Sequence, residues 1–307
     1  MVELQSCKAA KALNAADGCT DAESKGMEVS TVSQLQLGIV SNCWKAQLDE
    51  GRTLTDLIDE AARRRFCAIE LRQGFLGEYE AFVADAPTSA AARTELANLS
   101  SRFPAVQLNL AVSLPIFGGL PLGDDVRFSG ALAASVALAR DERPHLRLVD
   151  TETRVPDLDD DAVAEASAAL AAMTRQLVQV DGFLSIEHAY QSWSIFWAMF
   201  QQARLDLGHA AVRLRCCFDP CNLLLTEHPA TVPAIVEAIR PGDVSMIHLK
   251  QRAGGLIQPD VAEGDLDWSH LMRTIRSQHH QGPWLFEVAP HSEIWKHLDQ
   301  SIRRLFG

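Results

Sequence analysis

Acidic and imidazole side chains end four short apolar segments in the second part of the chain. They are Glu187, Asp219, His248 and Glu287, which follow the runs Leu184-Ser185-Ile186, Cys217-Phe218, Met246-Ile247 and Leu285-Phe286. Carboxylate and imidazole groups are ligands for divalent cations. We therefore predict one divalent metal ion held by these four residues, with Mn²⁺ favoured and Mg²⁺, Co²⁺ and Zn²⁺ left open. The alternative is that each residue pairs with an arginine or lysine at a strand end.

The segments that must position these residues have the length and composition of buried parallel strands. Eight such segments occur, at Leu37–Val40, Ala68–Leu71, Val106–Val112, Leu146–Val149, Phe183–Ile186, Val212–Phe218, Val244–Leu249 and Trp284–Val288. Apolar stripes with helical spacing lie between them, such as Leu54, Leu57, Ile58 and Ala61.

Eight strand–helix units without a break in composition predict a single-domain α/β fold, a (β/α)8 TIM barrel, over residues 34–307. A doubly wound open sheet is the alternative, and it predicts a glycine-rich phosphate loop after an early strand. The first turn instead reads Ser41-Asn42-Cys43-Trp44. The barrel is therefore preferred.

Composition narrows the function classes. The 307 residues are 47% hydrophobic with a net charge of −12, which argues against a nucleic-acid partner because that contact needs a basic face. No apolar run is long enough to span a bilayer.

The seven cysteines form no C-x-x-C pair, so a reducing, cytoplasmic setting is expected. Residues 1–33 are expected to form a flexible tail, and the oligomeric state, including a homo-oligomer, is open.

Five local motifs occur in order along the second half of the chain. They are Ser185-Ile186-Glu187-His188, Cys217-Phe218-Asp219-Pro220-Cys221-Asn222, Ile247-His248-Leu249-Lys250, Glu263-Gly264-Asp265-Leu266-Asp267-Trp268 and Phe286-Glu287. Together they resemble the xylose isomerase-like TIM-barrel superfamily, in its sugar phosphate isomerase/epimerase branch. The resemblance covers about residues 35–307 and is strongest in the second half.

This resemblance implies an enzyme that acts on a small carbohydrate or keto-sugar. It implies a metal ion bound by the four residues above, and an acid/base pair formed by Glu187 and Glu287. One glutamate would remove the proton next to a carbonyl and the other would return it. The chemistry is reasonable because a carboxylate cannot deprotonate such a carbon unless the developing enediolate is stabilised, as a Lewis acid does.

Several further residues are candidates for substrate binding. Asn222 stands where many ketose epimerases of this branch carry a histidine, and an amide can hydrogen-bond a hydroxyl but cannot titrate. The other candidates are His188, Lys250, Trp44, Glu70 and Arg72. Glu70 and Arg72 share one face of a strand, so a salt bridge between them is the alternative to a substrate contact.

Other functions stay open at this point. A lyase on the same scaffold would share the first proton abstraction and then eliminate water or an aglycone. An endonuclease specific for apurinic sites and a non-catalytic sugar-binding protein are more remote alternatives. The aromatic residues near the expected strand ends favour a bulky substrate, and the loop Ala253–Gly264 lacks the basic cluster that a phosphate would need.

Overall fold

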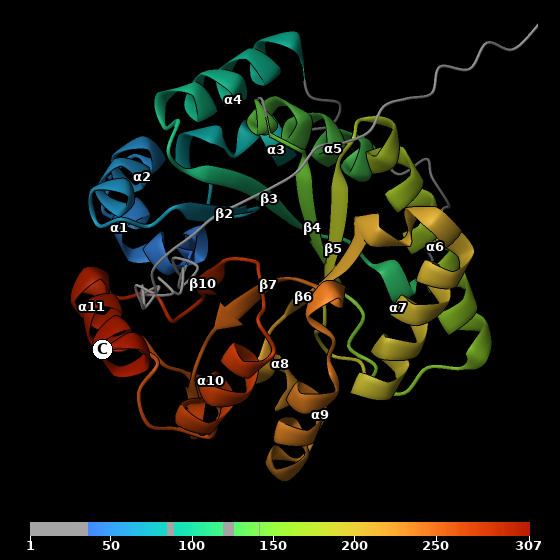
Figure 1. Ribbon diagram of the computed structural model, residues 1–307. Coiled ribbons are helices and arrows are strands. Elements are labelled where there is room, and N and C mark those ends of the chain that lie inside the picture. The colour runs from blue at the N-terminus through green and yellow to red at the C-terminus, as the bar shows by residue number, and fades with distance from the viewer. Residues whose placement is uncertain (1–35, 85–88, 119–125, 141) are drawn as a thin grey trace, which may run out of the picture. The chain divides into compact units, whose positions relative to one another are not determined.

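Eight parallel strands close into one barrel (Figure 1). The computed structural model describes residues 36–84, 89–118, 126–140 and 142–307. The barrel strands are β1 (Leu37–Val40), β2 (Ala68–Arg72), β3 (Gln107–Ser113), β4 (His145–Val149), β5 (Phe183–Glu187), β6 (Leu214–Phe218), β7 (Val244–Leu249) and β10 (Trp284–Phe286). The predicted TIM barrel is confirmed, whereas the expected tail at 1–33 lies outside the described residues.

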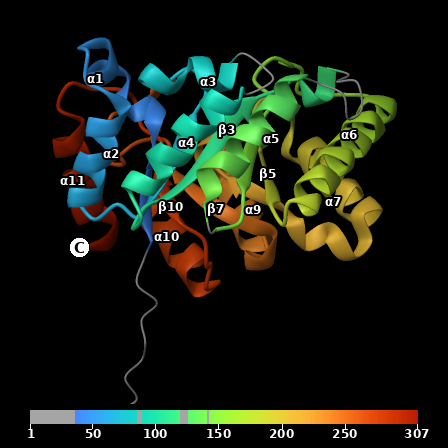
Figure 2. The same cartoon turned by 90° about the horizontal axis from the view of Figure 1, so that it is seen from above.

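Helices surround the barrel on its outside (Figures 1 and 2). They are α1 (Lys45–Asp49), α2 (Leu54–Arg63), α3 (Ala81–Ala84), α4 (Ala90–Arg102), α5 (Val126–Ala139), α6 (Asp160–Gln179), α7 (Trp193–Leu207), α8 (Pro220–Leu223), α9 (Val232–Ala238), α10 (Trp268–Ser277) and α11 (Ile294–Phe306). The predicted stripe of α2 is buried, and Thr53 caps this helix by accepting a hydrogen bond from the Asp56 amide. None of the helices in the described part of the chain is long and apolar enough to cross a membrane.

The inside of the barrel holds a small apolar cluster and several polar side chains. The apolar members are Val40, Ala68, Cys217, Met246 and Leu285. Strand register places Glu70 beside Asn109, Arg147 beside Ser185, and Glu187 beside Cys217. Since alternate residues of a strand face the same side, these polar residues point into the barrel. The barrel interior therefore becomes polar toward the ends of its strands.

Several strand ends differ from the prediction, most of them by one residue and two of them by two residues. The third strand begins at Gln107 and runs on to Ser113, and the sixth begins at Leu214 because residues 208–213 form a 3-10 helix. The last strand ends at Phe286 instead of Val288. The Val288 amide donates to the Cys43 sulfur instead of to a strand partner. Glu287 therefore lies just beyond the strand, at the mouth of the barrel.

A short hairpin follows β7. It consists of β8 (Arg252–Ala253) and β9 (Leu256–Ile257), which pair antiparallel. Gly254 and Gly255 both have positive φ angles, the conformation that a two-residue hairpin turn requires. The Gln251 side chain is fully buried and donates to the carbonyls of Ala262 and Leu266. These bonds hold the start of the hairpin in place.

Candidate metal centre and substrate pocket

The four predicted ligands meet at the carboxyl ends of β5, β6, β7 and β10. One ligand atom from each of Glu187, Asp219, His248 and Glu287 lies within 4.8 Å of the others, and all four residues are buried. Parallel strands of a barrel bring their carboxyl ends to one face, which explains why residues so far apart in sequence converge. The geometry provides three carboxylates and one imidazole around a common point.

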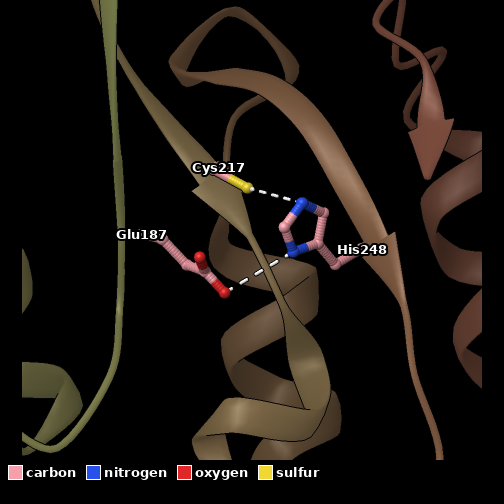
Figure 3. Close-up of side chains that lie close together, drawn as sticks. All are labelled: Glu187, Cys217 and His248. Atoms are coloured by element: carbon pink, nitrogen blue, oxygen red, sulfur yellow. Dashed lines mark hydrogen bonds and ion pairs between the residues drawn. The ribbon is translucent and has the colours of Figure 1, made fainter. Parts of the chain in front are cut away.

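The two nitrogens of His248 face different surroundings (Figure 3). Nδ1 lies 3.5 Å from Glu187 Oε1 and 3.3 Å from Glu287 Oε2, and it has no hydrogen-bond partner among the described residues. Nε2 faces the barrel interior, 3.3 Å from the Cys217 sulfur and 3.5 Å from Glu70 Oε1. Nδ1 is therefore the nitrogen directed at the carboxylates.

Asp219 is oriented by the backbone that follows it. Its Oδ1 accepts hydrogen bonds from the amides of Cys221 (2.8 Å) and Asn222 (3.2 Å), so Asp219 is the N-cap of α8. Pro220 occupies the first helical position, where its missing N–H costs nothing. The remaining oxygen, Oδ2, lies 2.6 Å from Lys250 Nζ. The local sequence Asp-Pro-Cys-Asn thus leaves one carboxylate oxygen for a cation.

Each glutamate of the centre is held by an arginine. Glu187 Oε2 lies 2.8 Å from Arg147 Nη1, and its Oε1 accepts from Asn222 Nδ2 at 2.9 Å. Glu287 Oε1 pairs with Arg72. Arg147 is fully buried whereas the Arg72 side chain is 29% exposed, so only the second guanidinium is open to solvent.

Lys250 connects the carboxylates at the mouth. Its Nζ lies 2.6 Å from Asp219 Oδ2, 2.6 Å from Glu287 Oε2 and 3.1 Å from Asn222 Oδ1. Burial would lower the pKa of Lys250, but Asp219 and Glu287 raise it well above its usual value. The amine therefore stays charged and counterbalances the neighbouring carboxylates.

Arg147 belongs to the site, although the strand-end pattern of the sequence did not predict it. Its guanidinium pairs with Glu187 and also with Glu70, to which Nε donates at 3.1 Å. Asn109 donates to the other oxygen of Glu70 at 3.1 Å. One feature of the sequence could have suggested Arg147: it is a charged residue within an otherwise apolar strand. It lies two residues before Val149 and so faces the same side of the strand as this residue of the pocket wall. The expected salt bridge between Glu70 and Arg72 is wrong, because each pairs with a different residue.

Electrostatics keeps the two glutamates ionised. Burial alone would raise the pKa of Glu187, but Arg147 and then His248 hold it below its usual value. Burial likewise opposes ionisation of Glu287, whereas Lys250 and Arg72 hold its pKa well below the usual range. Burial raises the pKa of Asp219 despite the opposing effect of Lys250. Burial also raises the pKa of Cys217 to about 12, so that its thiol stays protonated.

The donor set fits a divalent metal ion. Oxygen and imidazole donors suit Mn²⁺, Mg²⁺, Co²⁺ and Zn²⁺, and the His248 Nδ1 atom is buried without a hydrogen-bond partner in the described structure. Cys217 forms a second candidate group with Glu187 and His248. Both candidate groups share Glu187 and His248, so within the described residues they define one centre.

A pocket of about 270 Å³ opens above this centre. It is lined by Arg72, Val149, Thr151, Glu187, Ala189, Tyr190, Cys221, Asn222, Leu225, Lys250, Arg252, Ile257 and Glu287. This volume lies near the lower end of ligand pockets, roughly 300 to 1,000 Å³. Three predicted substrate-binding residues, Arg72, Asn222 and Lys250, therefore lie in the pocket wall.

The other three predicted substrate-binding residues lie outside the pocket wall. Trp44 is fully buried and its ring centroid lies 6.0 Å from that of Trp295. Glu70 is enclosed in the barrel beside Arg147. His188 is buried with Nε2 2.5 Å from the Gln191 carbonyl oxygen, and burial lowers its pKa to about 4. None of these three residues lines the described pocket, and their contact with substrate stays a prediction.

The aromatic residues near the strand ends pack mainly against each other. Trp193 stacks on Trp197 at 5.2 Å, and Phe196 and Phe200 continue the cluster along α7. Tyr190 is the aromatic residue in the pocket wall among the described residues. The aromatic content is therefore explained by helix packing, and it no longer supports a bulky substrate.

No protein-family model matches the sequence, and no curated protein matches it. Several solved structures match the fold. A xylose isomerase domain protein from Alicyclobacillus acidocaldarius has a TM-score of 0.60 at 14% identity, covering 89% of this chain and 100% of that chain.

Two further structures carry functional descriptions. The IOLI protein with a bound zinc atom has a TM-score of 0.59 at 11% identity, covering 88% of this chain and 95% of the other. An L-ribulose 3-epimerase has a TM-score of 0.58 at 15% identity, covering 88% of this chain and 86% of the other. At such identities the likeness concerns the fold. The chain therefore has the fold of the xylose isomerase-like TIM barrels, the superfamily that its five motifs resemble.

Proposed function

We propose that the protein is a divalent-metal-dependent sugar isomerase or epimerase that removes and returns a proton next to a carbonyl. The observation that carries the proposal is the cluster of Glu187, Asp219, His248 and Glu287, whose ligand atoms lie within 4.8 Å of one another beneath an open pocket. Structural neighbours that include sugar epimerases add support at the level of the fold. Mn²⁺ is the ion that we expect, because carboxylate oxygens predominate.

The roles of the two glutamates follow from their positions. Both line the pocket, and they come from strands on either side of β6 and β7. One ionised carboxylate can accept the proton and return it at the adjacent carbon, which gives isomerisation; inversion needs the second carboxyl group to take up a proton from solvent and to deliver it to the opposite face. We assign Glu187 and Glu287 as this acid/base pair. A divalent ion, when bound, would supply Lewis acidity that polarises the substrate carbonyl.

Neighbouring polar residues would bind and orient the substrate. Lys250 places a charged amine in the pocket wall, where it can stabilise negative charge that develops on a substrate oxygen. Asn222 lines the same wall and is fixed by bonds to Glu187 and to the His188 carbonyl. Its amide can hydrogen-bond a sugar hydroxyl without changing its charge. These contacts suit a small polyhydroxylated ketone.

The test combines metal analysis with a panel of ketoses in D₂O. We expect stoichiometric divalent metal and entry of solvent deuterium at the carbon next to the carbonyl of the accepted sugar. Glu187→Gln and Glu287→Gln should each reduce the exchange rate about 10³-fold, as for loss of a general acid or base. Glu237→Gln, an exposed change on α9, is the matched control and should exchange normally.

Circular dichroism should show the same helix content in all variants. Failure of deuterium to enter any ketose in metal-loaded protein would contradict the proposal. Release of a leaving group with an enone product would instead assign the lyase function.

A further inference from the structure

The pocket wall contains a guanidinium that the candidate metal centre does not use. Arg252, the first residue of β8, lines the pocket together with Lys250. Its Nε donates to the Gly255 carbonyl at 3.0 Å. No acidic side chain of the described structure lies within ion-pair distance of this guanidinium, so both Nη groups are left for a ligand.

Hydrogen bonds and strand pairing hold the backbone of Arg252 in place. Its amide donates to Gln251 Oε1 at 2.9 Å, and its carbonyl accepts from the Asp265 amide at 2.7 Å. Pairing of Arg252 with Ile257 completes the hairpin. A charged group on such an anchored segment loses little further freedom when it binds a ligand, which favours tight recognition.

Some charged side chains of the pocket wall form ion pairs, and one of them does not. Its cations are Arg72, Lys250 and Arg252, and its carboxylates are Glu187 and Glu287. Glu287 pairs with both Arg72 and Lys250, while Glu187 pairs with the buried Arg147. Arg252 is the remaining cation of the wall. A substrate with one negative group could therefore pair with this remaining guanidinium.

The geometry points to a substrate that carries a carboxylate. We propose that Arg252 binds this carboxylate at the rim while the keto and hydroxyl groups lie over Glu187 and Glu287; the inference rests on the proposed function. The planar fork of one guanidinium matches a carboxylate through two parallel N–H···O bonds. A phosphate ester carries about −1.5 to −2 charges at neutral pH, more than one unpaired guanidinium neutralises.

Calorimetry on Mn²⁺-loaded protein tests this inference with three probes that differ at the terminal carbon: D-fructose, D-fructuronate and D-fructose 6-phosphate. We expect D-fructuronate to bind about 10- to 100-fold tighter than D-fructose, the range for a charge-assisted hydrogen bond. Arg252→Gln should reduce this ratio to about one, and Arg252→Lys should retain part of it. Arg63→Gln, an exposed change at the end of α2, should leave the ratio unchanged.

The outcomes separate this inference from the proposed function. Equal binding of D-fructose and D-fructuronate, or tightest binding of D-fructose 6-phosphate, would overturn the carboxylate assignment. Deuterium entering D-fructose would still support the isomerase in that case. Conversely, an Arg252-dependent preference for D-fructuronate, without exchange in any ketose or keto-acid, would support the carboxylate site and contradict the isomerase.

Discussion

Arg147 is the buried residue on which the charges below the pocket depend. Its guanidinium has no exposed surface and contacts Glu187 on one side and Glu70 on the other. Burial of a charged group is unfavourable unless partners offset the loss of water. Burial would raise the pKa of Glu70, yet Arg147 holds it well below its usual value. The pair therefore stays ionised and fixes one oxygen of Glu187.

A double-mutant cycle at this pair should reveal strong coupling. Glu70→Gln should cost about 3 kcal/mol of unfolding free energy, because the buried guanidinium of Arg147 loses one of its two carboxylate partners. Arg147→Met should cost more, since it leaves two carboxylates without their cation. The double variant should be more stable than the sum of both changes predicts. Guanidinium chloride unfolding provides the measurement.

The exposed pair Arg63–Asp59 serves as the control for this cycle. Both side chains are more than half exposed, at 68% and 53%. Asp59→Asn should change the unfolding free energy by less than about 1 kcal/mol, as is usual for surface ion pairs. Simple additivity of the Glu70 and Arg147 variants would show that the buried pair does not act as a unit.

At the scale of elements, the position of Glu287 depends on how closely β10 approaches β7. Glu287 follows the last residue of β10, and its amide donates to the Leu249 carbonyl at 3.1 Å. Gly282 precedes this strand and lies against β7. A Cβ atom at Gly282 would come within 1.8 Å of the Ser245 carbonyl oxygen. The absence of a side chain there lets the two strands pair.

Gly282→Ala should therefore separate the start of β10 from β7. We expect a loss of about 1 to 3 kcal/mol of unfolding free energy, the range for an overpacked site, together with weaker Mn²⁺ binding. Gly242→Ala is the matched control, because a Cβ there meets no atom within 4 Å. It should change stability by less than about 1 kcal/mol. Equal effects of the two changes would contradict the close-approach explanation.

The hairpin after β7 is also an element-scale feature of the pocket. The buried side chain of Gln251 holds the start of the hairpin in place. Arg252 and Ile257 then contribute one cation and one apolar side chain to the pocket rim. The sequence predicted a loop in this region but no strands, because two-residue strands have no periodic signal. Arg252, for which the sequence suggested no role, is part of the pocket wall.

For the whole molecule, the proposed metal would link four strands of one closed barrel. A ligand that binds only the folded state stabilises it, by about 2.7 kcal/mol at 100 times its dissociation constant. For a domain of this size, each kcal/mol of unfolding free energy corresponds to about 2 to 4 °C in melting temperature. Removal of the metal with EDTA should therefore lower the melting temperature by roughly 5 to 10 °C.

Differential scanning calorimetry with and without Mn²⁺ checks this expectation. The Glu287→Gln variant should show a smaller shift, because one ligand of the proposed centre is changed. Addition of Mn²⁺ to the EDTA-treated protein should restore the original melting temperature. Identical melting with EDTA and with saturating Mn²⁺ would contradict a metal site that spans these strands.

Local sequence patterns were enough to predict the barrel and the four residues that meet at its mouth. Apolar runs with helical stripes between them repeat locally, and carboxylate and imidazole groups at strand ends are visible without coordinates. The ends of the sixth and eighth strands were less well predicted, because the 3-10 helix at 208–213 and the Cys43–Val288 contact depend on neighbouring segments.

Contacts between side chains of different strands could not be predicted from these patterns. The positions of Glu70 and Arg72 on one strand face suggested a mutual pair, yet the barrel places Arg147 beside Glu70 and Glu287 beside Arg72. Trp44 and His188 are buried outside the pocket wall, whereas Arg252 enters it. Strand periodicity specifies the face of a residue but not its cross-barrel neighbour. Charge pairing across the barrel depends on closure of all eight strands, which no local pattern encodes.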